Sequence, residues 1–145
     1  MTTAETAGYS GKPISAKLGF KPGMTAAFVA LPRACESLAA WPDFGTVTRA
    51  DTWTTPLKPE TFDLIHAFTA SAEELAAGLP MLQAAIRRDG MIWISWPKKA
   101  AKVPTDVTED VVRSAALRLD LVDVKVAAID AVWSGLKLVI RKERR

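Results

Sequence analysis

Short apolar runs alternate with amphipathic segments along most of the chain, and this alternation predicts an α/β fold. Apolar or β-branched runs bounded by turn residues are typical of buried strands, whereas apolar residues at helical spacing are typical of helices. The predicted strands are 24–30, 46–50, 62–68, 91–94, 122–128 and 136–140. The predicted helices are 14–18, 32–40, 71–88 and 106–119. Strands that alternate with helices favour a mainly parallel sheet covered on both faces.

Two of the helices carry capping-box patterns at their predicted starts. Ser71 is followed at the third position by Glu74, and Asp106 is followed in the same way by Glu109. In such a box the first side chain accepts a hydrogen bond from a backbone N–H at the head of the helix. Pro80 lies inside the first of these helices. Because proline lacks a backbone N–H, we expect it to kink that helix or split it in two.

The run 91–94 is uncharged and apolar, which predicts a central strand of the sheet. The chain then continues through Ser95, Trp96, Pro97, Lys98 and Lys99. Because a proline cannot extend a sheet ladder, we expect the chain to leave the sheet at Ser95 to Pro97. Polar groups just beyond the carboxyl end of a central parallel strand lie where open α/β sheets bind their ligands. The segment 95–99 is therefore either an anion-binding loop, with the serine as a donor and the lysines as point charges, or a solvated loop whose Trp96 covers the end of the sheet.

The last two predicted strands are close enough in sequence to form an antiparallel hairpin, with its turn at Trp133, Ser134 and Gly135. The return of the hairpin would bring this turn to the same sheet edge as 95–99. Trp133 would then either wall an aromatic, cation-lined pocket or pack within the hairpin, and the packing role is slightly favoured. The strands 46–50 and 122–128 both carry charged residues, which predicts that they form the edges of the sheet.

Composition limits the classes of protein to which the chain can belong. With 145 residues, 49% of them hydrophobic, the sequence suits a single domain over 9–145 behind a disordered lead at 1–8. The net charge of +3 permits an anionic partner but is too small for a dedicated DNA-binding protein. One cysteine and one histidine exclude an intrachain disulfide and a Cys/His metal cage. With no signal peptide and no apolar run of bilayer length, we expect a cytoplasmic protein that makes no use of a membrane.

The order of elements resembles the core of the class I S-adenosylmethionine-dependent methyltransferases. "TFDLIHAF" resembles the strand that carries the fourth motif of that family, and "LPMLQAAIRRDGMIWISW" resembles the helix, glycine turn and strand that follow it. "DLVDVKVAAIDAVWSGLKLVIRK" is similar to the final two strands. The resemblance implies a three-layer, Rossmann-like, mainly parallel six-stranded sheet with an antiparallel C-terminal hairpin. It also implies the strand order 2-1-3-4-6-5, numbered along this chain, and S-adenosylmethionine as the cofactor.

A second resemblance concerns other segments of the chain. "GYSGKPISAKLGFKPGM" and "SWPKKAAKVPTDVTEDVVR" together are similar to a small bacterial family known as a domain of unknown function. This resemblance supports the domain boundaries and implies no activity.

The segment that corresponds to the methyl-donor loop departs from the methyltransferase pattern. That loop is glycine-rich in the family, because glycine lets the backbone approach the ligand. Here the segment 30–34 reads Ala-Leu-Pro-Arg-Ala, and Pro32 removes a donor. Asp51 lies near the place of the acidic residue that should hold the ribose, but an isolated aspartate in a loop is typically a turn residue. S-adenosylmethionine binding is therefore disfavoured, and the domain is interpreted as a degenerate methyltransferase.

Four further features have a structural interpretation that outweighs a functional one. A core histidine is favoured over a proton carrier for His66, which lies late in its strand. Cys35 lies among alanine and leucine and is interpreted as a core residue. Ser95 lacks a G-x-S-x-G elbow, so it is not interpreted as a hydrolase nucleophile. The basic tail 141–145 is interpreted as a solvated terminus rather than a contact for nucleic acid or acidic lipid.

The sequence leads to one preferred function and two alternatives. The preferred hypothesis is a methyltransferase-like domain without methyltransferase activity that binds a small anionic or nucleotide-like ligand at the carboxyl edge of the sheet. The candidate contacts are Ser95, Trp96, Lys98, Lys99, Trp133 and Ser134, with His66 and Arg33 nearby. The alternatives are a divergent methyltransferase or other transferase, and a protein-interaction domain without a small ligand. The sequence leaves open whether the chain forms a homo-oligomer.

Overall fold

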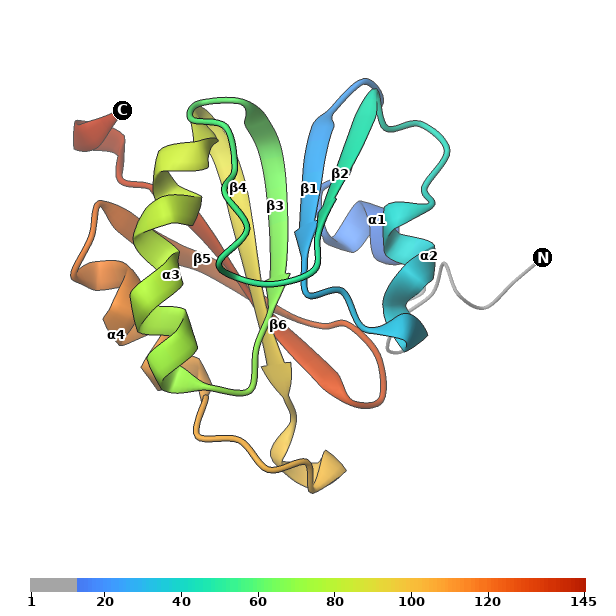
Figure 1. Cartoon of the computed structure of the whole chain (residues 1–145), viewed down its shortest axis with the longest axis vertical. Helices are drawn as coiled ribbons and strands as arrows, with labels where there is room; N and C mark the ends of the chain where they lie inside the picture. The colour runs from blue at the N-terminus through green and yellow to red at the C-terminus, as the bar shows by residue number, and fades with distance from the viewer. Residues whose placement is uncertain (1–12) are drawn as a thin grey trace.

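Six strands form one sheet in the computed structural model, which describes residues 13–145 (Figure 1). The strands are β1 (Thr25–Val29), β2 (Thr46–Ala50), β3 (Phe62–Phe68), β4 (Ile86–Pro97), β5 (Leu121–Ala128) and β6 (Trp133–Ile140). Their order is β2-β1-β3-β4-β6-β5. The first four are parallel, and β6 is antiparallel to both of its neighbours. The predicted order and hairpin are therefore confirmed, whereas the predicted lead at 1–8 lies outside the described residues.

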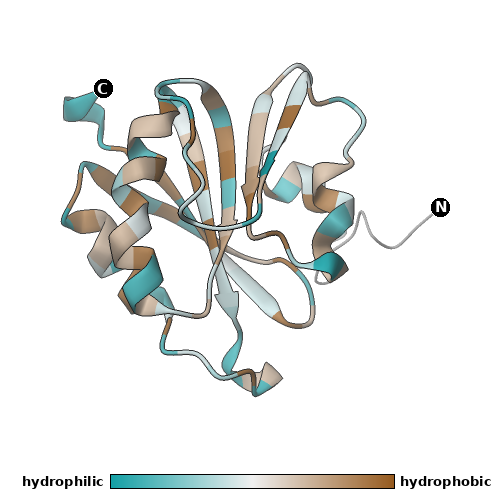
Figure 2. Cartoon of the chain, viewed as in Figure 1, coloured by the Kyte–Doolittle hydropathy of each residue, from teal (hydrophilic) through white to brown (hydrophobic). Residues whose placement is uncertain are grey.

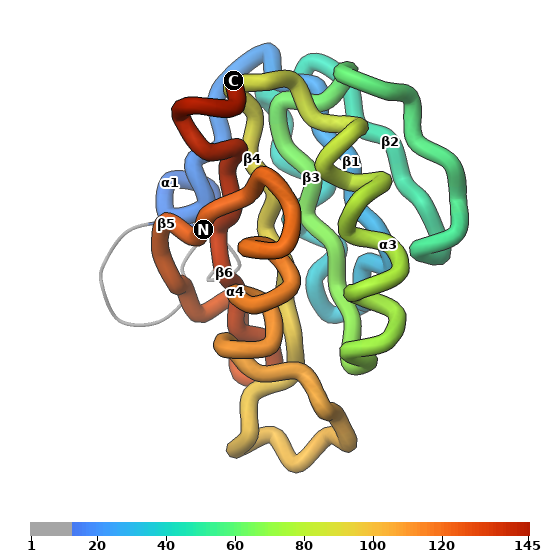
Figure 3. The backbone as a smooth tube through the Cα atoms, turned by 90° about the vertical axis from the view of Figure 1, so that its left-hand side faces the viewer, coloured from blue at the N-terminus to red at the C-terminus, as the bar shows by residue number. Residues whose placement is uncertain are grey.

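Helices lie on both faces of the sheet, as Figure 3 shows for α1 and α3 on opposite sides. The α-helices are α1 (Ile14–Lys17), α2 (Glu36–Ala39), α3 (Ala72–Ala85) and α4 (Glu109–Leu117). Three short 3-10 helices are η2 (Arg33–Cys35), η3 (Lys99–Ala101) and η4 (Lys142–Arg144). The predicted helix 32–40 is thus a 3-10 turn followed by a single α-helical turn. In the described part of the chain, no helix is both long and apolar enough to cross a membrane.

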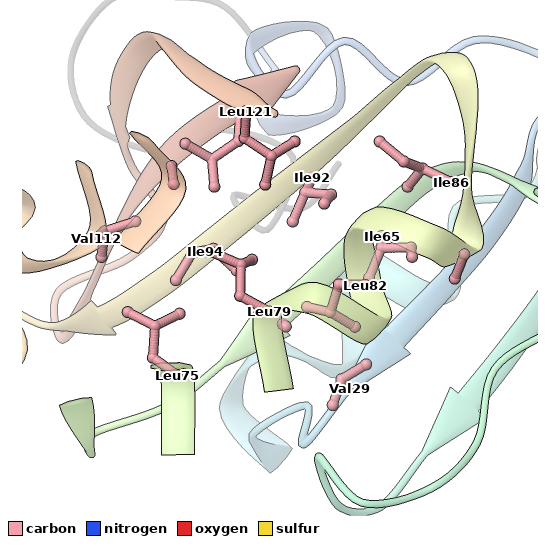
Figure 4. Packing of buried hydrophobic residues seen from close by; sticks show 14 of the residues in the cluster. Val29, Ile65, Leu75, Leu79, Leu82, Ile86, Ile92, Ile94, Val112 and Leu121 are labelled. Carbon is pink, nitrogen blue, oxygen red and sulfur yellow. The ribbon is translucent and has the colours of Figure 1, made fainter. Parts of the chain in front are cut away.

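The core consists of two clusters, one on each face of the sheet. On one face Leu75, Leu79 and Leu82 of α3 pack toward Ile65 of β3 and Ile92 of β4 (Figure 4). On the other face α1 and α2 cover a smaller cluster of the same strands. Figure 2 shows that hydrophilic residues gather at loops and helix ends, whereas hydrophobic residues follow the sheet. Burial of this apolar area is the main stabilising term of the fold.

The outer strands are those expected, but β5 does not expose the residues that its pattern suggests. The simple alternation of 122–128 predicts valines inside and charged residues outside. Val124 and Val126 are instead 51% and 47% exposed. The pairing with β6 shifts register between Asp123 and Lys125, and such an irregularity changes the face to which the following side chains point. β6 is buried between β4 and β5 as expected, with Leu136 and Leu138 nearly inaccessible.

The boundary between α3 and β4 differs from the prediction. α3 runs through Pro80 without a break, because its leucines are buried while Pro80 itself is exposed. The helix ends at Ala85, and Ile86 already pairs with Phe62 of β3. The arginines at 87 and 88 therefore belong to an irregular first part of β4 rather than to the last turn of the helix. Basic residues followed by glycine are typical of a helix end and would place it near Arg88. The helix ends earlier because Ile86 is buried in the core as part of β4.

The two helix starts are capped, but by a different combination of residues than predicted. Ser71 Oγ accepts a hydrogen bond from the backbone N–H of Glu74, as expected. α4, however, is capped by Thr108, whose Oγ1 accepts from Val111. Asp106 caps α3 instead, since its Oδ1 accepts from the backbone N–H of Ala72 at 2.7 Å. The segment before α4 therefore ties the starts of both helices together.

Candidate functional site

The carboxyl edge of the sheet, at the bottom of Figure 1, brings together the end of β4 and the start of β6. Pro97 is opposite Trp133, and Trp96 is opposite Ser134. The backbone N–H of Lys98 donates to the carbonyl of Val132 at 2.7 Å. The residues expected to form the hairpin turn are therefore part of β6, and the turn is the preceding segment 129–132. The two lysines and the hairpin meet at one edge, as the antiparallel register requires.

Ser95 and Trp96 do not lie in an exposed loop, because β4 continues to Pro97. Ser95 is completely buried on the α1 side of the sheet. Trp96 is also buried and belongs to the core cluster beneath α3 and α4. Neither side chain is placed to meet a ligand in solution. The terminal position of Pro97 explains the error, since a proline is tolerated as the last residue of a strand as well as just beyond it.

Ser95 pairs with His66, and the pair is sealed inside the core. Ser95 Oγ lies 2.7 Å from His66 Nε2, and both residues have no exposed surface. Burial lowers the pKa of His66 from 6.5 to about 3, so the imidazole is neutral at physiological pH. His66 Nδ1 has no hydrogen-bond partner among the described residues. This matches the favoured interpretation of a core histidine, with half of its hydrogen-bonding capacity unused.

Aromatic contacts connect this buried pair to the surface at Trp133. The imidazole of His66 stacks on Phe68 with 4.3 Å between ring centroids. Phe68 in turn meets Trp133 edge to face at 5.3 Å. Trp133 is only partly buried, so one part of its indole packs on the core and another remains accessible. Both roles weighed for Trp133, hairpin packing and an aromatic wall, are compatible with this placement.

Asp130 organises the hairpin turn and was not singled out from the sequence. Its Oδ1 accepts from the backbone N–H groups of Val132 and Trp133, at 2.8 and 2.7 Å. Its Oδ2 accepts from the thiol of Cys35 at 3.5 Å. Burial, together with the charge of Asp130, raises the pKa of Cys35 to about 12, so the thiol stays protonated. The sequence signal for Asp130 is an aspartate at the start of a short turn, where its side chain can accept hydrogen bonds from the backbone N–H groups two and three residues later.

Two cationic segments lie beside the hairpin turn. The hydrogen bond between Cys35 and Asp130 attaches η2 to the turn, and the bond from Lys98 to Val132 attaches the segment after β4. Arg33 begins η2 and is exposed. On the other side, Lys98 is partly buried while Lys99 and Lys102 are exposed. Within residues 13–145, none of these four cations forms an ion pair. The described part of this edge therefore carries four cations without an ion pair, beside the carboxylate of Asp130 in the turn.

Trp53 lies across the end of β1, next to the segment that corresponds to the methyl-donor loop. Ala30 adopts a φ of 55°, a left-handed conformation that favours glycine. Trp53, which follows β2, is buried and donates from Nε1 to the carbonyl of Phe68 in β3 at 2.8 Å. Because β1 lies between β2 and β3, this indole reaches across the end of β1. Asp51 is exposed two residues earlier.

Trp53 is held firmly in that position. A Cβ added to Gly78 of α3 would lie 2.6 Å from the indole ring, so the glycine is what lets the tryptophan pack against the helix. The sequence pattern predicts no helix or strand between 50 and 62, and Trp53 was not among the residues singled out there. The only available signal was a large aromatic side chain in a segment otherwise rich in threonine and proline.

Comparisons with solved structures agree on the fold. An S-adenosylmethionine-dependent methyltransferase from Aquifex aeolicus aligns with a TM-score of 0.63 and 15% identity over 88% of each chain. One from Mesorhizobium loti aligns with a TM-score of 0.59 and 15% identity over 86% of this chain and 94% of that one. A ribosomal protein L11 methylase from Lactobacillus delbrueckii subsp. bulgaricus gives 0.54 and 18%, over 88% and 75%. The chain therefore has the class I, Rossmann-like fold of these methyltransferases.

Sequence comparison gives no further assignment: no family model and no curated protein sequence matches the chain. At identities below a fifth, the structural similarity establishes the fold and leaves the activity open.

Proposed function

We propose that this chain is a methyltransferase-fold domain that binds a small anionic or nucleotide-like ligand at the carboxyl edge of its sheet and does not transfer methyl groups. The observation that carries the proposal is a group of cations without ion pairs, Arg33, Lys98 and Lys99, on the two segments attached to the hairpin turn that precedes the partly exposed Trp133. Cationic side chains supply the attraction for phosphate or carboxylate oxygens. The indole supplies a flat surface on which a base or another planar group can stack.

The set of residues that contact the ligand is smaller than the sequence suggested. Arg33, Lys98, Lys99, Trp133 and the partly exposed Ser134 can reach it from the surface. Ser95 and His66 lie behind Phe68 and act as a rigid support for the strands that carry these groups. Trp96 belongs to the opposite core and is removed from the set. The ligand site is therefore an open cationic edge with one aromatic wall.

The contacts of Trp53 and the presence of Pro32 just beyond β1 support the proposal that the chain transfers no methyl groups. Pro32 cannot donate a hydrogen bond to a ligand, and Trp53 is fixed there by its bond to Phe68. A cofactor would have to displace a buried tryptophan from its contact with α3. Loss of such a side chain from its packing site costs several kcal/mol, roughly 3 to 5 on replacement by alanine. Any interaction gained with the cofactor would first have to offset this cost.

A thermal unfolding experiment tests the ligand site. Phosphate and ADP should raise the melting temperature of the parent chain, because a ligand that binds only the folded state stabilises it by mass action. Lys98→Ala/Lys99→Ala should unfold at nearly the parent temperature in plain buffer, since these lysines form no ion pair in the described chain, and should reduce this rise. Lys58→Ala/Lys142→Ala removes the same charge from exposed positions elsewhere and should keep it. If none of a panel of anions stabilises the parent, the edge is a solvated cap and the interaction-domain alternative gains support.

A further inference from the structure

A row of side chains crosses three strands on the α1 side of the sheet and ends in two lysines. Trp93 of β4 is opposite Lys137 of β6, and Lys137 is opposite Lys125 of β5. Residues opposite one another on neighbouring strands project from the same face. The indole of Trp93 donates to the carbonyl of Leu18 at 2.9 Å, which fixes this face as the one under α1. The row therefore runs from a buried tryptophan outward to two cations.

A third lysine approaches the row from the segment after α1. Lys21 follows Leu18 by three residues, and Leu18 is held against Trp93. The charges of Lys125 and Lys21 both act on Lys137 and, after burial, are the causes that lower its pKa. None of the three lysine side chains forms an ion pair or hydrogen bond with a carboxylate in residues 13–145. Lys137 is thus acted on by two like charges, and no carboxylate contributes to the shift of its pKa.

This arrangement is unfavourable in the free protein. Like charges directly opposite each other on adjacent strands are destabilising. Lys137 also lies on β6, which has a strand on each side, so its stem and part of its charge are removed from water. An apolar residue at 137 would continue the face of Trp93 and avoid both costs. The repulsion is relieved if an anion lies among the three ammonium groups.

We propose that Lys21, Lys125 and Lys137 form a second anion site, separate from the carboxyl edge, that binds the phosphate group of a small molecule. Lysine provides a compact charge and three rotatable donors, which suit the oxygens of a phosphate rather than the planar fork of a carboxylate. Three positive charges match an anion that carries two or more negative charges. The site lies on the sheet face rather than at its edge, so it can be tested independently of the edge.

The test uses pyrophosphate on chains that lack the edge lysines. In Lys98→Ala/Lys99→Ala, the NMR signals of the ε-carbons of Lys21, Lys125 and Lys137 should move together on titration, with one dissociation constant. Adding Lys137→Met keeps the aliphatic stem and removes the charge, and should weaken pyrophosphate binding by roughly tenfold or more. Adding Lys142→Met instead, in the exposed η4, is the matched control and should leave the affinity unchanged.

The outcomes separate this site from the carboxyl edge. The substitution Lys137→Met should also raise the melting temperature in phosphate-free buffer, because it removes the repulsion and the partly buried charge. Retention of full affinity in Lys137→Met, or no movement of the three lysine signals, overturns the face site. If Lys98→Ala/Lys99→Ala alone abolishes pyrophosphate binding, the face site also fails while the proposed edge site stands.

Discussion

His66 and Ser95 introduce a polar pair into an otherwise apolar layer of the core. A buried polar group is costly unless it is hydrogen-bonded, and the 2.7 Å contact satisfies Ser95 and one nitrogen of His66. His66 Nδ1 remains unpaired among the described residues, and no charge is available to support an imidazolium. The pair is therefore stable only while the histidine is neutral, and acid should act on this residue directly.

The stability of the folded chain should fall between pH 7 and pH 5 because of His66. In the folded state its pKa is lowered to about 3, while the unfolded chain titrates near 6.5. Below pH 6.5 the unfolded state therefore binds a proton that the folded state does not, and the free energy of unfolding decreases by about 2 kcal/mol across this interval. Urea unfolding at each pH measures this, and since the sequence has a single histidine the assignment is direct.

The matched control for this prediction is His66→Leu/Ser95→Ala, which removes both polar partners and leaves no unpaired group. Its free energy of unfolding should be nearly flat between pH 7 and pH 5. A parent chain whose stability does not change over the interval would mean that His66 keeps an ordinary pKa and can reach solvent. The alternation of 62–68 was sufficient to predict a buried histidine. Its partner could not be predicted, because Pro97 was interpreted as lying beyond the strand that buries Ser95.

At the scale of elements, the starts of α3 and α4 show where local patterns stop being informative. Ser71 was predicted correctly as a cap, and its Oγ accepts from the backbone N–H of Glu74. Before α4, both Asp106 and Thr108 are good capping residues at suitable distances from the helix. The contact between α3 and α4 decides whether Asp106 or Thr108 caps α4. Asp106 turns to Ala72 of α3, a residue 34 positions away, and no sequence window contains both.

Substitution of Asp106 should therefore destabilise α3 rather than α4. Asp106→Ala should lower the free energy of unfolding by about 1 kcal/mol, the usual contribution of a capping side chain. Asp106→Asn retains the accepting oxygen and should recover most of it. Asp51→Ala, at an exposed position, is the control and should have little effect. Hydrogen exchange should locate the loss in the first turn of α3. Faster exchange confined to the first turn of α4 would contradict the assignment.

At the scale of the whole molecule, the fold was more predictable than the site. Hydrophobic runs and charged strands predicted the two edges and the inner place of β6, whereas the full strand order came from the resemblance to the methyltransferase core. The carboxyl edge depends on long-range contacts that no run of residues encodes. The hydrogen bond from Cys35 to Asp130 joins residues 95 positions apart, and it is what attaches η2 to the hairpin turn. Trp53, which follows β2, likewise bonds to Phe68 of β3 across the end of β1.

The bond of Trp53 across the end of β1 leads to a prediction for the methyl donor. Isothermal titration of the full chain with S-adenosylmethionine at micromolar protein concentration should give no binding heat, while a methyltransferase of the same fold titrated beside it should. The physical reason is local: Ala30 keeps the left-handed backbone of the cofactor loop, but Pro32 lacks a donor and Trp53 bridges β2 and β3 over the end of β1. A dissociation constant in the low micromolar range would require Trp53 to swing out, and would favour a divergent transferase over the proposed binding domain.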